Sequence, residues 1–209
     1  MNKAKLAQLE SYFLAQYPQG FEDPELVKIA KKHNIPKATE RVREAFRKIR
    51  FKDSEIIIDA MISNVSKSSM ISLFEKPKYR DALKAMSTNE SVCLTEALRK
   101  QLHGNKQKGF NEMLDCLSEY KLAKWSLISI LPFYFKPQEY IFVKPTTAKK
   151  ILAFLEIQDI VYKPRPSWEF YQGFASHIDS IKNEVADSLS PNNAALTGFL
   201  MMSIDHVSA

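Results

Sequence analysis

The sequence has only five glycines among its 209 residues. Folds built from many β-hairpins need glycine in their tight turns, because several turn types require a positive φ. Scarce glycine therefore favours helices, and apolar residues do recur at helical spacing along the whole chain. We expect an all-α protein of about ten helices, with little or no β structure.

Cysteine is also scarce. Cys93 and Cys116 are the only two, and neither has a partner at the two-to-four-residue spacing of a zinc site. We expect them to be buried thiols in a reducing compartment. The four histidines are far apart in the sequence, at positions His33, His103, His177 and His206. The sequence therefore predicts no metal site and no cofactor.

The chain lacks a long apolar run. The longest one, Trp125–Phe135, contains two serines and a proline and is too short to cross a bilayer. Residues 1–13 are mixed polar and charged, unlike the apolar core of a secretory signal. We expect a cytoplasmic protein with no membrane contact, in which residues 125–135 form the most buried helix.

Apolar residues make up 45% of the chain and charged residues 26%, which is typical of a folded protein. We expect one helical domain over residues 1–204 and a flexible tail at 205–209. A division into a basic lobe (1–66) and an aromatic-rich lobe (77–204) is the alternative. The best candidates for short strands are residues 140–143 and 159–162.

Positive charge is concentrated in one stretch of the sequence. Residues 28–52 contain ten basic residues and two acidic ones, a surplus of +8 in a chain whose net charge is +6. Such a cluster is typical of a surface that binds a polyanion such as nucleic acid. The basic residues are Lys28, Lys31, Lys32, Lys37, Arg41, Arg43, Arg47, Lys48, Arg50 and Lys52.

The same stretch resembles a helix-turn-helix unit. Ala30, Asn34 and Ile35 match the small residue, the turn residue and the apolar residue of that motif, whereas Glu40 stands where the family usually has an apolar residue. The resemblance implies DNA binding by the second helix. The predicted nucleic-acid contacts are Lys37, Arg41, Arg43, Arg47 and Arg50. An ordinary solvated helix pair, or a face that binds an acidic protein, are the alternatives.

Two further basic groups are candidates. Lys106 and Lys108 lie between Gly104 and Gly109, where they could contact phosphate, although a solvated turn between two helices explains them better and no Walker loop is present. Residues 124–174 mix aromatic and basic side chains, as surfaces that stack on single strands do. At helical spacing, however, most of these aromatic residues are expected in the core.

Lys144 and Thr146 flank Pro145 at a predicted helix start, where backbone N–H groups favour an anion. Three segments around this point resemble a family of uncharacterised bacterial proteins, and the resemblance implies no activity. The segments are Lys124-Trp125, Val143-Lys144-Pro145-x-Thr147 and Tyr162-x-Pro164-x-Pro166-x-Trp168-x-x-Tyr171.

The same region also resembles the helix-hairpin-helix DNA glycosylases, with residues 122–135 as the buried helix and 144–150 as the opening of the next helix. The glycine-rich hairpin is absent between Ser118 and Trp125, and Lys144 takes the place of the catalytic aspartate. A buried lysine could act as a nucleophile. The leading hypothesis is therefore nucleic-acid binding by the basic helix pair. A base-excision enzyme centred on Lys144 and a helical protein-interaction module are the alternatives.

Overall fold

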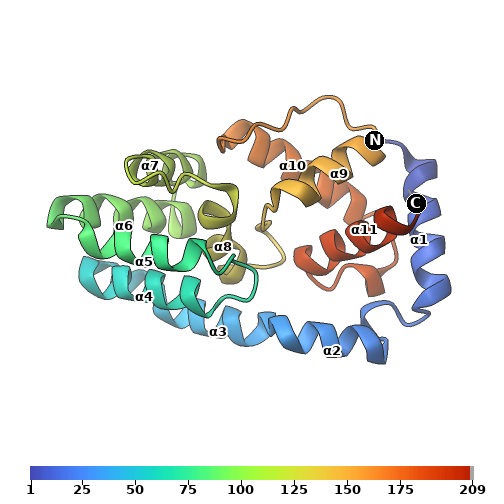
Figure 1. The fold of residues 1–209 in the computed structure, drawn as a ribbon, viewed down its shortest axis with the longest axis horizontal. Coiled ribbons are helices and arrows are strands. Elements are labelled where there is room, and N and C mark those ends of the chain that lie inside the picture. The colour runs from blue at the N-terminus through green and yellow to red at the C-terminus, as the bar shows by residue number, and fades with distance from the viewer. Residues whose placement is uncertain (208–209) are drawn as a thin grey trace.

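The computed structural model describes residues 1–207, and the chain is all-helical over that range, with no strand (Figure 1). This confirms the predicted fold class. The α-helices are α1 (Lys3–Gln16), α2 (Pro24–His33), α3 (Ile35–Ala45), α4 (Ser54–Lys67), α5 (Glu75–Ala85), α6 (Thr88–His103), α7 (Lys106–Ser118), α8 (Trp125–Phe135), α9 (Pro145–Phe154), α10 (Trp168–Lys182) and α11 (Asn193–Val207). Three short 3₁₀ helices are η1 (Gly20–Glu22), η2 (Lys48–Lys52) and η3 (Asp187–Leu189).

The helices form two groups around one continuous apolar core (Figure 1). Helices α3 to α8 pack on one another in one group, and α1 packs with α9, α10 and α11 in the other. Helix α2 runs along one edge of the molecule between the groups, and α7 contacts α10 across the middle. The first and last helices, α1 and α11, lie side by side. The first group is therefore one continuous stretch of the chain, whereas the second joins the chain's first helix to its last three.

Several helices begin at a residue whose side chain caps the first turn. The Asp23 carboxylate accepts a hydrogen bond from the Glu25 N–H at the start of α2, and Pro24 occupies the first helical position. Asp53 accepts from two N–H groups at the start of α4. Each cap satisfies backbone donors that have no partner inside the helix. Local sequence signals therefore determine these boundaries.

Helix α8 is the central helix of its group, and every residue in it except Ser126 is buried. This confirms the prediction for Trp125–Phe135. Most aromatic residues of segment 124–174 also belong to the core rather than to the surface. Helices α3, α4, α6 and α7 all pack against α8. A helix surrounded on all sides cannot be amphipathic, which explains its nearly uniform apolar sequence.

Residues 140–143 and 159–162 do not form the predicted strands. The backbone of the first segment bonds to side chains instead of to a neighbouring strand. The Tyr171 hydroxyl bonds both the N–H and the carbonyl oxygen of Ile141, and the Val143 N–H donates to Ser129 Oγ. These partners satisfy buried backbone groups that a β-ladder would otherwise have to satisfy.

Two other predictions need correction. Cys93 is exposed rather than buried, and Cys116 is half-buried, where burial raises the pKa of its thiol. Helix α11 continues to Val207, so positions 205–207 are helical, whereas the last two positions of the predicted tail lie outside the described residues. No helix within residues 1–207 has the length and apolar character needed to cross a membrane.

Candidate nucleic-acid interface and its pocket

Helices α2 and α3 follow one another end to end along the edge of the molecule and do not pack face to face (Figure 1). A single residue, Asn34, separates them in the left-handed conformation with φ 42°. A helix-turn-helix unit instead has a turn of 3–4 residues and two packed helices that cross at a large angle. Ala30 would lie between the helices in that motif, but here it is exposed. The structure therefore does not support the helix-turn-helix interpretation.

The arginines predicted to contact nucleic acid make contacts within the protein. Arg41 Nε donates to Oδ1 of the buried Asn64 at 2.7 Å. Arg43 Nε donates to the carbonyl oxygen of Phe135 at 2.8 Å. These two bonds fasten α3 to α4 and to the end of α8. Arg47 and Arg50 both pair with the Glu44 carboxylate at 2.8 Å. Two of these arginines therefore have side-chain donors committed within the fold, and the other two share one carboxylate.

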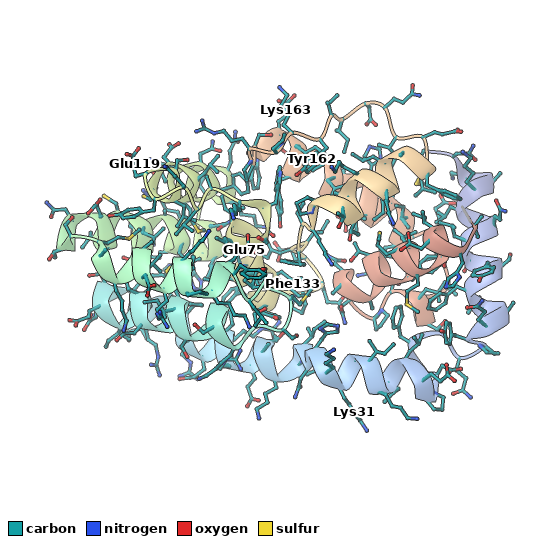
Figure 2. All side chains as sticks on the ribbon, in the orientation of Figure 1. Lys31, Glu75, Glu119, Phe133, Tyr162 and Lys163 are labelled. Carbon is teal, nitrogen blue, oxygen red and sulfur yellow. The ribbon has the colours of Figure 1, made fainter. Side chains whose placement is uncertain are left out.

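The lysines of the same segment are different. Lys28, Lys31, Lys32 and Lys37 are exposed, and within residues 1–207 none of them forms a salt bridge with a carboxylate. Figure 2 shows Lys31 pointing outward from α2, away from the rest of the molecule. We call these four lysines the basic surface. They carry positive charge that is available to a ligand, as do the exposed Lys48 and Lys52 of η2.

The second basic group, Lys106 and Lys108, makes contacts within the protein. Lys106 pairs with Glu139, and its Nζ lies 5.1 Å from the centroid of the Tyr140 ring. Lys108 Nζ lies 3.9 Å from Glu112. Gly109, which the sequence places beside these lysines, lies where α7 meets α6. A Cβ atom at Gly109 would lie 2.2 Å from the backbone N of Gln101. The cluster therefore belongs to the contact between two helices.

Lys144 and Thr146 lie at a pocket of about 510 Å³. Four segments meet there: the loop before α5, the first turn of α8, the start of α9 and the connector that contains Pro164. This volume lies within the range of about 300–1,000 Å³ that is usual for small-ligand sites. Figure 2 labels Glu75, on the pocket wall, near the middle of the molecule. We call this cavity the central pocket.

Two lysines and one glutamate give the central pocket its charge. Lys124 Nζ lies 3.5 Å from Glu75 Oε1, and the Ser126 hydroxyl donates to the same carboxylate at 3.2 Å. The Glu75 side chain is only 17% exposed. Lys144 is exposed, and no carboxylate of residues 1–207 pairs with it. The pocket therefore has a small positive surplus.

Helix geometry adds to this charge. The N-cap residues of α8 and α9 are Lys124 and Lys144, and neither helix start has a side-chain cap. Pro145 fixes the first residue of α9 in a helical conformation. The N–H groups of an uncapped first turn carry partial positive charge, which favours an anion. The charges of the two lysines and the partial charges of the two helix starts therefore both favour a bound anion.

His33 connects the basic surface to the central pocket. It is the last residue of α2, and its Nδ1 lies 3.0 Å from Oγ of Ser69 on the pocket wall. Burial lowers the pKa of His33, and the charges of Lys32 and Lys144 lower it further. Lys32 of the basic surface and Lys144 of the central pocket thus both lower the pKa of the same imidazole. The basic surface and the central pocket are parts of one positively charged region.

The three segments that resemble the uncharacterised bacterial family meet at this pocket. Lys124 and Trp125 line it, as do Lys144 and Pro164. The Trp125 indole N–H also donates to the carbonyl oxygen of Lys163 at 2.8 Å, which holds the connector against α8. The sequence predicted an anion site at Lys144 but not the pocket around it. It missed His33, Ser69, Glu75 and Ser126, because their place at the pocket depends on how segments far apart in the sequence pack together.

Comparisons of the chain with protein-family models, curated protein sequences and solved structures found no match. Within residues 1–207, no group of three or more histidine, cysteine, aspartate or glutamate side chains is arranged to hold a metal ion.

Proposed function

We propose that this protein binds nucleic acid through the basic surface on α2 and α3 together with Lys144 at the central pocket. The observation that carries the proposal is that lysines without carboxylate partners stand on both sides of the His33–Ser69 contact. A polyanion that lies across this contact meets positive charge along its length. Lysines are point charges that bind phosphate without reading a base edge, so the binding is independent of base sequence.

The physical basis is the release of counterions. Each phosphate that a lysine neutralises frees a condensed cation, so the binding constant falls steeply with salt concentration. The arginines of α3 and η2 contribute less, because the side-chain donors of Arg41 and Arg43 are bonded within the fold and Arg47 shares a carboxylate with Arg50. The contact residues we assign are therefore mainly lysines.

The two alternatives remain predictions. A base-excision enzyme needs a buried amine at Lys144, and this side chain is exposed. Borohydride trapping on abasic DNA tests it, because only an amine nucleophile leaves an adduct, and that adduct disappears in Lys144→Arg. An acidic protein partner would use the same lysines. It differs from nucleic acid in having no regularly spaced phosphates and no bases.

The test is a fluorescence-anisotropy titration at low salt with labelled single-stranded DNA, duplex DNA, RNA and polyglutamate of matched charge. The variant replaces Lys31, Lys32 and Lys37 with glutamine. The matched control replaces three exposed lysines elsewhere, Lys78, Lys84 and Lys121, so that the net charge is the same in both variants.

We expect the wild type and the control to bind oligonucleotides similarly, and the basic-surface variant to bind at least tenfold more weakly, since each lost phosphate contact costs a share of the affinity. Equal losses in both variants would mean that only net charge matters and would contradict the assigned surface. Binding of polyglutamate without binding of any oligonucleotide would favour the acidic protein partner.

A further inference from the structure

Leu73 and Phe74 are the most exposed large apolar side chains of residues 1–207, at 78% and 83%. Folding usually removes such side chains from water, because their exposure forgoes the free energy of burial. A single exposed apolar residue is common, but two consecutive ones in a loop beside a pocket form a patch. Ser72 and Glu75, which flank the pair in sequence, both line the central pocket.

The loop that carries these residues is fixed in place. The buried side chain of Ile71 anchors it to the core. The Ser68 and Tyr134 hydroxyls form a buried hydrogen bond of 2.9 Å, and Ser68 Oγ also accepts from the Met70 N–H. The Phe74 N–H donates to Ser72 Oγ at 3.2 Å. The exposure of Phe74 is therefore maintained by contacts on the inner side of the loop.

An exposed aromatic ring that adjoins in sequence a residue of a lysine-bearing pocket suits a nucleotide. The face of the ring can stack on a base, and the ammonium groups can bind the phosphates on either side of that base. Lys124 and Lys144 lie in the same pocket as Ser72 and Glu75. The distinctive feature here is therefore an exposed aromatic residue, Phe74, in a loop whose flanking residues Ser72 and Glu75 line a positively charged cavity.

We propose that Phe74 stacks on an unpaired base of the bound nucleic acid, while the neighbouring phosphates lie against Lys124 and Lys144. This inference rests on the proposed function and adds to it a preference for single strands. In a duplex the faces of the bases are covered by their neighbours, so Phe74 has nothing to stack on. Stacking tolerates any base, since every base has a π-face.

The experiment compares a short labelled oligothymidine with a duplex of the same length in anisotropy titrations. Phe74→Ala removes the ring, Phe74→Tyr keeps it, and Val92→Ala removes an exposed apolar side chain from α6 as the matched control. Because Phe74 and Val92 are both exposed, we expect all three variants to fold. Far-UV circular dichroism verifies this.

We expect Phe74→Ala to weaken binding of the single strand by roughly 5- to 100-fold, with little change for the duplex. Phe74→Tyr and Val92→Ala should bind the single strand like the wild type. Equal loss for both ligands, or no loss in Phe74→Ala while the wild type binds, would overturn the role of Phe74 and leave the proposed function intact. Failure of the wild type to bind any oligonucleotide would overturn both.

Discussion

Lys124 Nζ lies 3.5 Å from Glu75 Oε1 on the wall of the central pocket. This pair joins the start of α8 to the start of α5. The Ser126 hydroxyl completes the contact by donating to the same carboxylate. Glu75 therefore holds a lysine that an incoming phosphate would otherwise bind, and it is the negative charge that opposes a polyanion here.

Replacing Glu75 with glutamine should strengthen nucleic-acid binding. The amide can still accept a hydrogen bond from Ser126, but it no longer attracts Lys124 or repels phosphate. Partly exposed pairs are worth about 0.2–1 kcal/mol, so we expect a gain of a few-fold in affinity at low salt. Glu112→Gln, which removes a carboxylate paired with Lys100 on the surface of α6 and α7, is the control and should change nothing. Identical behaviour of the two variants would contradict the placement of the ligand in the pocket.

Binding should tighten as the pH falls below about 6.5, the ordinary pKa of histidine, because the pKa of His33 in the free protein lies below that value. The pKa of His33 is lowered by burial and by the charges of Lys32 and Lys144. A bound phosphate offsets those charges and raises the pKa, so the complex takes up a proton. The increase cannot exceed tenfold per pH unit, because one group titrates. Anisotropy titrations between pH 7.5 and 6 measure it, and we expect His33→Asn to lose the dependence.

The free protein should respond to pH in the opposite sense. A histidine whose pKa is lowered by folding binds its proton more readily in the unfolded chain, so stability falls as the pH drops below about 6.5. Urea denaturation of the wild type and of His33→Asn at several pH values separates the contribution of His33 from that of other titrating groups. A wild-type decrease that persists unchanged in His33→Asn would show that His33 is not responsible.

Gly109 should not tolerate a side chain, because α6 and α7 approach closely at this position. An added Cβ would lie 2.2 Å from the backbone N of Gln101 and 2.6 Å from the carbonyl oxygen of Ala97. We expect Gly109→Ala to lower the free energy of unfolding by about 1–3 kcal/mol in urea denaturation, as overpacking does.

Gly198 provides the control for this substitution. It lies within α11, and the nearest atom to an added Cβ is 3.9 Å away, on Phe21. Alanine there should be neutral or stabilising by up to about 1 kcal/mol, since it favours the helix. Equal effects of Gly109→Ala and Gly198→Ala would contradict the close contact between α6 and α7.

Local features of the sequence predicted much of the fold. The apolar run of α8 predicted a buried helix, and the structure confirms it; the caps at Asp23 and Asp53 likewise depend on only a few neighbouring residues. The predicted strands at 140–143 and 159–162 do not form. A strand must pair with another strand, and the sequence of a short extended segment does not specify that partner. In the first segment the Tyr171 hydroxyl takes that role, and it comes from another helix.

The candidate site was less predictable for the same reason. The charge of Arg41 and Arg43 is evident from the sequence, but their bonds to Asn64 and Phe135 depend on how α3 packs. Lys144 was recognised from its own neighbours. Its position beside Glu75 and Lys124 depends on segments far apart in the sequence. Composition therefore located the charge, and tertiary packing determined which of it is available to a ligand.

The salt dependence of duplex binding tests the proposed interface most directly, with wild type, Lys144→Gln and Lys144→Arg measured side by side. We expect log K to fall linearly with log salt in the wild type, and the slope to be shallower by roughly 0.9 in Lys144→Gln, because one phosphate contact is lost. Lys144→Arg keeps the charge and should keep the wild-type slope. A wild-type binding constant that does not change with salt, or the absence of binding to both duplex and single-stranded DNA at low salt, would contradict nucleic-acid binding through these lysines.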